Sequence, residues 1–201
     1  GTVYPQFDRN LNHSDEEYKT GEPAHVGMDF NVGKMSAIIH VERDGDPIAV
    51  GEILGAYDTP EMIRLIKQRL WRETSGGEFE KLCEIYVYPD ASGGSRKTVN
   101  AGTSDIALLR DAGFHVMADS KNPPVRDRIN SVNAMFCNAE GERRYKVNTK
   151  LCPIYTEARE QQIYNKQGEP DKTHDKDHPN DAADYYIYNK FPLVRPMAAM
   201  L

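Results

Sequence analysis

The distribution of apolar positions along the chain predicts three strands close together, followed by alternating helices and strands. Runs rich in strand-forming residues occupy residues 25–32, 36–42 and 47–54. The last two runs are separated by "RDGD", whose Asp44-Gly45 pair is a signal for a tight hairpin. We therefore expect a three-stranded antiparallel meander near the start of the domain.

Helical periodicity begins directly after this meander. Thr59 is the candidate N-cap, Pro60 takes the first helical position and Glu61 follows in the first turn. The remaining predicted elements are, in chain order, a strand at 83–88, a helix at 104–112, a strand at 114–118, a helix at 124–138, a strand at 143–148 and helices at 152–165 and 179–191. A meander followed by such units indicates an α/β fold, a mixed β-sheet with helices on both faces.

The polar ends of the chain set the expected domain limits. Residues 1–22 are rich in turn formers, so we interpret them as a linker or an N-terminal extension. The domain would then cover residues 23–192, followed by a C-terminal tail at 193–201. A chain of 201 residues that is 39% hydrophobic and 28% charged suits one globular domain of this size.

Several classes of protein are disfavoured by composition. No apolar run approaches the roughly 18 residues that cross a membrane, and the N-terminus lacks the apolar stretch of a signal peptide. We therefore expect a protein that is neither secreted nor membrane-bound. Three widely spaced cysteines indicate structural thiols in a reducing compartment. The net charge of −6 is unusual for a nucleic-acid binder but permits a carboxylate cluster that holds cations.

Acidic residues stand at three places where strands and a helix begin or end. Asp29 lies in the first predicted strand, where a lone buried carboxylate costs several kcal/mol unless it is solvated, paired or bound to metal. Asp90 follows the strand at 83–88, and Asp181 lies in the first turn of the last helix. Asp177 and Asp184 are spaced to share a helix face with Asp181. A sheet with a helix packed on it could bring these carboxylates together.

Such a cluster suits hard divalent cations. Mg²⁺ prefers oxygen ligands, usually one or two carboxylates with substrate phosphate and water. Two ions about 4 Å apart can generate hydroxide and stabilise both oxygens of an in-line phosphoryl displacement. The sequence therefore favours hydrolysis with two divalent cations, Mg²⁺ or Mn²⁺, and no covalent nucleophile.

Basic residues near these aspartates are candidates for DNA contacts. Lys34 follows Asp29, Lys121 follows the strand at 114–118, and Arg96 and Lys97 lie in the Gly/Ser-rich stretch after Asp90. For Arg96 and Lys97, a solvated loop explains the sequence equally well. Arg126 and Arg128 could contact DNA or be exposed helix charges. The histidines of "THDKDH" (173–178) we interpret as a solvated approach to the last helix rather than a zinc site.

Four stretches that contain these residues carry a family resemblance. They are "VGMDFNVGKMSAIIH", "VYPDASGGSRKT", "GFHVMADSKNPPVRDRINSVNAMFCNAEGERRYKVN" and "DHPNDAADYYIY". In this order, over residues 23–192, they resemble the nuclease domain of the large terminase subunit of tailed bacteriophages, of the headful-packaging type. The resemblance implies a ribonuclease H-like fold and a metal-dependent endonuclease that cuts concatemeric viral DNA during genome packaging.

The resemblance also implies roles and partners. Asp29, Asp90 and Asp181 match the catalytic aspartates of the family, and Asp177 and Asp184 would be additional metal or water ligands. Expected partners are double-stranded DNA, a terminase ATPase domain, the portal protein and the small terminase subunit, in the cytoplasm of the infected bacterial host. Two alternatives remain open: another ribonuclease H-like nuclease of the resolvase or transposase type, and a non-catalytic docking module of the packaging motor.

Overall fold

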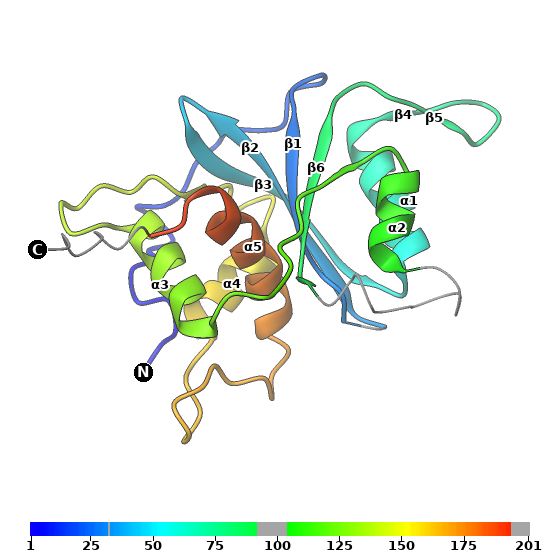
Figure 1. Ribbon diagram of the computed structural model, residues 1–201. Helices are drawn as coiled ribbons and strands as arrows, with labels where there is room; N and C mark the ends of the chain where they lie inside the picture. Colours follow the sequence, from blue (N-terminus) through cyan, green and yellow to red (C-terminus); the bar gives the residue numbers. More distant parts are fainter. Residues whose placement is uncertain (32, 92–103, 194–201) are drawn as a thin grey trace, which may run out of the picture.

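The predicted meander forms the centre of a mixed six-stranded sheet (Figure 1). The computed structural model describes residues 1–31, 33–91 and 104–193. Antiparallel pairing joins the first three strands, which are β1 (Ala24–Asp29), β2 (Met35–Arg43) and β3 (Asp46–Ala56). Parallel pairing adds the outer strands, which are β6 (Ile85–Pro89), β7 (His115–Val116) and β8 (Lys146–Val147). The sheet order is β7-β6-β1-β2-β3-β8, which confirms the predicted mixed topology.

Helices cover both faces of this sheet, as predicted. One face carries α1 (Thr59–Leu70) and α2 (Asp105–Asp111). The other carries α3 (Val125–Phe136), α4 (Pro153–Gln161) and α5 (Asp177–Lys190). None of these helices is both long and apolar enough to span a bilayer.

The alternation of side chains along β1 and β6 decides which face each residue serves. Val26 and Met28 of β1 belong to the core beneath α1, whereas Tyr88 of β6 belongs to the core beneath α5. Asp29 and Asp90 therefore take the parity that faces α5. This placement follows from strand geometry alone, before any side-chain contact is considered.

Several predicted details differ in the structure. Asp58, not Thr59, caps α1, because the Asp58 carboxylate accepts a hydrogen bond from the Glu61 amide nitrogen at 2.9 Å. Thr59 is buried instead, and its hydroxyl lies 2.9 Å from Asp105. The last helix begins at Asp177 rather than 179. A short hairpin, β4 (Arg72–Glu73) with β5 (Phe79–Glu80), has only two residues per strand and no apolar alternation that would announce it.

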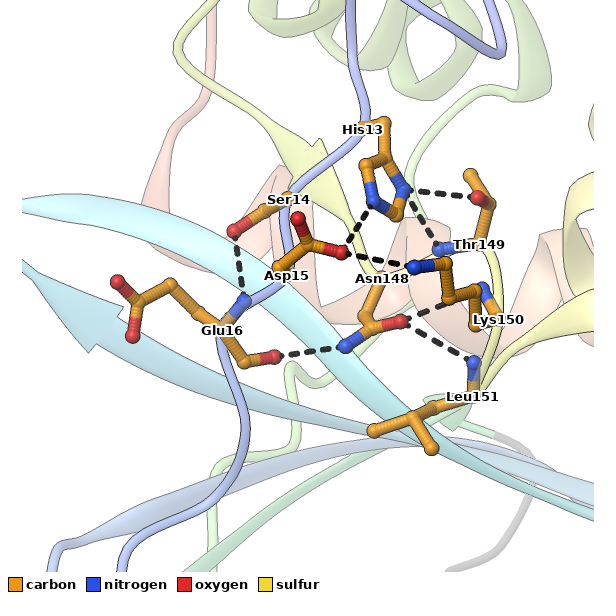
Figure 2. Close-up of polar contacts among 8 residues, drawn as sticks. All are labelled: His13, Ser14, Asp15, Glu16, Asn148, Thr149, Lys150 and Leu151. Carbon is orange, nitrogen blue, oxygen red and sulfur yellow. Dashed lines mark hydrogen bonds and ion pairs between the residues drawn. The ribbon is translucent and has the colours of Figure 1, made fainter.

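The N-terminal segment packs on the domain as an extension. Val3, Tyr4 and Phe7 are buried in the core beneath α5. The Asn12 side chain donates hydrogen bonds to the carbonyl oxygens of Phe136 and Tyr145, both at 2.9 Å. Figure 2 shows the next stretch lying against residues 148–151, with Asn148, Thr149 and Lys150 bonded to Glu16, His13 and Asp15. Polar side chains of this segment and of residues 148–151 satisfy backbone groups where the two stretches meet the domain.

Close approach of α5 to β1 requires a glycine. A methyl group at Gly27 would lie 2.0 Å from the carbonyl oxygen of Ala182, far inside van der Waals contact. Because Gly27 lies two residues before Asp29, and Ala182 follows Asp181, this contact sets the spacing between the two aspartates. The absence of a side chain at Gly27 is therefore what lets the helix sit directly on the strand.

A buried chain of hydrogen bonds runs under α5. The His40 Nδ1 lies 3.2 Å from the His25 carbonyl oxygen, and its Nε2 lies 2.7 Å from the Tyr145 hydroxyl. The Tyr145 and Tyr155 hydroxyls are 2.6 Å apart, and Arg159 donates to Tyr155 from Nε at 2.9 Å. With the proton on Nδ1, the Tyr145 hydroxyl donates to His40 and accepts from Tyr155, and the Tyr155 hydroxyl accepts from both Nε and Nη2 of Arg159. His40 is therefore held neutral, and burial lowers its pKa to about 3.

Replacing Gly27 by alanine tests the strand–helix contact. We expect Gly27→Ala to destabilise the domain by at least about 2 kcal/mol, because the added methyl meets backbone atoms that cannot rotate away. Urea unfolding followed by the fluorescence of Trp71 measures this. Gly76→Ala is the matched control, since no heavy atom lies within 4 Å of a methyl there. Equal losses in the two variants would contradict the argument.

Acid should destabilise the domain partly through His40. An unfolded histidine takes up a proton near pH 6.5, but folded His40 resists protonation until about pH 3. Its contribution to stability is present above pH 6.5 and is lost as the pH falls, by about 2 kcal/mol at pH 5. We expect His40→Gln to be less stable at pH 7 but to lose less on going to pH 5. Urea unfolding at both pH values measures this, with His174→Gln as the control because His174 is exposed. If His40→Gln lost as much stability between pH 7 and pH 5 as the wild type, His40 would not be the neutral group that we infer.

Candidate active site

Two of the predicted site residues lie side by side at one edge of the sheet. Met28 and Pro89 are the last paired residues of the parallel strands β1 and β6, and Asp29 and Asp90 follow them directly. Both aspartates are almost buried, at 8% and 7% exposure. Since neighbouring strands are about 4.8 Å apart, the two carboxylates start from adjacent backbone positions.

The third aspartate reaches the same edge from α5, which packs across β1, β2 and β6. Asp181 precedes the Ala182 carbonyl that contacts Gly27. Tyr185, one turn further along α5, is close enough to all three aspartates for their charges to affect its hydroxyl. Burial raises the pKa of its hydroxyl and Arg128 opposes this, while the negative charges of Asp181, Asp90 and Asp29 raise it further. The structure therefore brings the three aspartates predicted to be catalytic into one neighbourhood.

Asp181 is held in an unusual electrostatic setting. Its Oδ1 forms an ion pair with Nη2 of Arg128 at 3.1 Å, and the Arg128 side chain is itself only 7% exposed. Burial raises the pKa of Asp181 to about 7, nearby Asp184, Asp29 and Asp177 add to this rise, and Arg128 opposes it. Because burial and the neighbouring carboxylates destabilise the ionised form of Asp181, a further positive charge nearby would stabilise it.

Asp29 is paired with a histidine of α5. Its Oδ2 lies 3.0 Å from Nδ1 of His178, and the Asn31 side-chain amide lies 2.9 Å from the other ring nitrogen. The hydrogen bond to Asp29 raises the pKa of His178 above its usual value. Exposed His174, by contrast, takes no part in this contact.

Asp177 and Asp184 differ sharply in their surroundings. Asp177 is buried near Asp29, burial raises its pKa, and its Oδ1 lacks a hydrogen-bond partner among the described residues. Asp184 is fully enclosed: Nη2 of Arg159 lies 2.6 Å from its Oδ1, and the Tyr4 hydroxyl donates to its Oδ2. These contacts give Asp184 a structural role in anchoring α5, and they favour Asp177 over Asp184 as an additional metal ligand.

The carboxylate oxygens are suitable ligands for a hard cation, but Asp29 and Asp181 are turned toward basic side chains. Across residues 1–31, 33–91 and 104–193, no group of three His, Cys, Asp or Glu side chains forms a ready metal site. Asp29 instead contacts His178, and Asp181 contacts Arg128. The unpartnered oxygen of Asp177 and the all-oxygen donor set match the preference of Mg²⁺ or Mn²⁺.

Two of the predicted DNA-contacting residues lie at this edge. Lys34 is exposed in the turn after β1, and its Nζ lies 2.9 Å from Oδ2 of Asp175. Lys121 is exposed and lines a small hollow together with Pro89 and Ala91, on either side of Asp90. Arg96 and Lys97 lie outside the described residues.

Sequence reasoning misses the roles of Arg128 and His178. The sequence suggests a DNA contact or an exposed helix charge for Arg128, yet this residue is buried against Asp181 and stacks at 4.7 Å over the Tyr185 ring. The interpretation of His178 as solvated is also wrong, because its ring contacts Asp29. Its helical spacing, three residues before Asp181, is the available signal, because it places the ring near the same edge of the sheet.

Comparisons with known proteins agree with this geometry. A profile of the family described as "Terminase RNaseH-like domain" matches residues 26–190. No curated protein matches the chain in sequence. Among solved structures, the nuclease domain of the P22 large terminase aligns with a TM-score of 0.66 and 17% identity, covering 96% of this chain and 94% of that one.

Two further structures cover the fold at different lengths. The large terminase of a thermophilic bacteriophage aligns with a TM-score of 0.67 and 19% identity over 94% of this chain. The chain spans only 44% of that large terminase. The nuclease domain of the large terminase g2p from bacteriophage SPP1, determined with bound Mn, aligns with a TM-score of 0.54 and 14% identity, covering 90% of this chain and 97% of that one. At these identities the structures establish the ribonuclease H-like fold, and because the family profile covers most of the domain, the chain belongs to the Terminase RNaseH-like domain family.

Proposed function

We propose that this chain is the DNA endonuclease domain of a phage large terminase, and that it cuts concatemeric viral DNA during genome packaging by two-metal-ion hydrolysis. The observation that carries the proposal is the meeting of Asp29, Asp90 and Asp181 at one sheet edge. They come from three separate elements, β1, β6 and α5. A purely structural role would not require three mutually repelling carboxylates in one place.

The residues of the chain would share the work as follows. Asp29, Asp90 and Asp181 would hold two divalent cations, with Asp177 as a further ligand. When bound, such cations activate water and stabilise both oxygens of an in-line phosphoryl displacement. Arg128 and His178 would position Asp181 and Asp29 through these contacts. Lys34, Lys121, Arg96 and Lys97 would contact the DNA backbone outside this centre.

Structures of two relatives support divalent cations in particular. The SPP1 nuclease domain was determined with bound Mn, and the large terminase nuclease of the thermophilic phage G20c was determined with bound magnesium. The latter aligns with a TM-score of 0.53 and 12% identity over 92% of this chain. We propose two ions, and not one, because this chain brings several carboxylates to the same edge of the sheet.

The proposal also includes a biological setting. We place the domain in the cytoplasm of the infected bacterial host, joined to a terminase ATPase domain and working with the portal protein and the small terminase subunit. Double-stranded DNA is its substrate. A strong preference for branched DNA would instead favour a resolvase-type enzyme, and a complete lack of cleavage would favour a docking module.

Metal-dependent cleavage of plasmid DNA is the central expectation. The chain should nick and linearise supercoiled plasmid in Mn²⁺ or Mg²⁺ with little sequence preference, and EDTA should stop it. Asp29→Asn, Asp90→Asn and Asp181→Asn should each lower the rate by about 100-fold or more, since each removes a ligand of the reacting centre. Agarose gels over a time course measure the rates.

A matched control separates the site from general effects of charge. Asp44 lies in the β2–β3 turn, at the opposite end of the sheet, with a positive φ of 55° that asparagine tolerates. Asp44→Asn should keep full activity. Cleavage that persists undiminished in EDTA, or an active Asp29→Asn variant, would refute the proposal.

The buried charge of Asp181 should also be visible in metal-free stability. The folded pKa of about 7 lies above the usual unfolded value near 3.9, so the wild type loses stability as pH rises between these values. Asp181→Asn carries no such cost and keeps an acceptor for Arg128. We expect it to be more stable than the wild type by on the order of 3 kcal/mol at pH 8 in EDTA, and nearly equal at pH 4.5. Urea midpoints at both pH values test this, and a constant difference would count against it.

A further inference from the structure

A cavity of about 750 Å³ opens beside the candidate active site. It lies between the start of α3 and the segment 163–171, and Asp177 and Asp181 of α5 line it. Asp181 therefore belongs both to this cavity and to the carboxylate cluster at the sheet edge. Anything bound in the cavity would lie directly next to the proposed reacting centre.

The outer wall of the cavity is a hairpin-like loop, residues 163–171. Tyr164 pairs with Pro170 as an antiparallel bridge, and the Asp171 amide nitrogen donates to the Ile163 carbonyl oxygen at 2.8 Å. In Figure 1 this loop projects from the body beside α4 and α5. The first strand of the loop is bonded to the N-terminal segment, because the Tyr164 amide nitrogen donates to the Gly1 carbonyl oxygen at 3.0 Å. The cavity therefore has two fixed walls.

Apolar groups are exposed on both walls. Val125 at the start of α3 is 46% exposed, and Ile163 on the loop is 45% exposed. Tyr164 and Pro170 add an aromatic ring and a flat apolar ring to the same lining. These side chains form a surface suited to a flat apolar group.

Polar atoms at the inner end of the cavity lack partners. Arg128 and Asp177 line it, both are more than nine-tenths buried, and Nε of Arg128 and Oδ1 of Asp177 have no hydrogen-bond partner among the described residues. On the loop and directly after it, the positive charges of Lys166 and Lys172 are balanced by the negative charges of Glu169 and Asp171. The charge balance therefore favours contact through the apolar walls, with polar contacts confined to the inner end.

We propose that this cavity binds one or two unpaired nucleotides of the strand being cut, next to the scissile phosphate. The bases stack on Tyr164 and pack against Val125 and Ile163, and the sugar-phosphate runs inward past Arg128 toward Asp181. The volume lies within the range of about 300–1,000 Å³ of small-molecule sites, which suits one or two nucleotides and not a duplex. Because every base has a flat face, such a site tolerates any sequence. The inference rests on the proposed nuclease function, since the nuclease centre is what brings a DNA strand to this place.

Binding of a single-stranded oligonucleotide tests the proposal without turnover. The probe is a fluorescein-labelled oligothymidylate of about 12 nucleotides, a length within the usual range of single-strand binding sites, titrated by anisotropy in Ca²⁺ to prevent cleavage. Ile163→Asn and Val125→Asn remove the apolar walls without adding charge, and each should weaken binding about 5-fold or more, because each loses apolar surface that a bound base would cover. Ile154→Asn is the matched control, because Ile154 is 52% exposed on α4 and lies outside the cavity lining. It should bind like the wild type, and thermal unfolding confirms that all three variants are folded.

Photo-crosslinking gives the position of the bound strand directly. An oligonucleotide that carries 5-iodo-deoxyuridine should crosslink to Tyr164, and mass spectrometry of the peptides should place the adduct there. Tyr164→Leu should lose this adduct.

The results separate this inference from the proposed function. Equal binding by Ile163→Asn, Val125→Asn and Ile154→Asn, or no binding of the oligothymidylate by the wild type, would overturn the nucleotide site and leave the cavity for a protein segment. Wild-type protein that never cuts plasmid in Mn²⁺, while the cavity variants still weaken oligonucleotide binding, would overturn the nuclease proposal and keep the nucleotide site.

Discussion

The contact between α5 and β1 at Gly27 is the constraint on which the candidate site depends. The sheet edge supplies Asp29 and Asp90 through strand geometry, but Asp181 reaches them only because the helix backbone touches the strand. Any side chain at Gly27 would push the helix outward. The position of a carboxylate from one element relative to two from others is therefore set by a residue that does no chemistry.

Burial of charge beneath α5 completes this placement. Asp184 and Arg159 are both fully buried, an arrangement whose desolvation cost is offset only when each charge has close partners. The Arg159 guanidinium stacks at 4.2 Å over the Tyr4 ring and also donates to Tyr155, while Tyr4 donates to Asp184. Because Tyr4 comes from the N-terminal segment, that segment helps to hold the helix that carries Asp181. It contributes to the site although it precedes the first strand of the sheet.

Sequence reasoning predicts the fold more completely than the site. The meander, the helix after it and the order of later elements follow from local periodicity and turn chemistry, so they are predictable. Residues that act through distant contacts are not. Arg128 looks like an ordinary helix charge until α3 is packed on α5, and Asp184 shares its spacing with metal-binding candidates until Arg159 is brought against it. The predicted cap of α1 is one residue late because Asp58 and Thr59 are both good caps.

Contacts with the basic residues Arg128 and His178 stabilise the acidic site in the folded protein. Asp29 and Asp181 would repel each other at a buried edge, but Asp181 pairs with the positive charge of Arg128, and Asp29 is hydrogen-bonded to the His178 ring. A divalent cation bound at this edge would compete with these partners, and the carboxylates would have to turn away from them. Arginine keeps its charge at any accessible pH, whereas histidine can lose its proton. Release of Asp29 is therefore the easier of the two steps, and Asp181 remains tied to the protein more strongly.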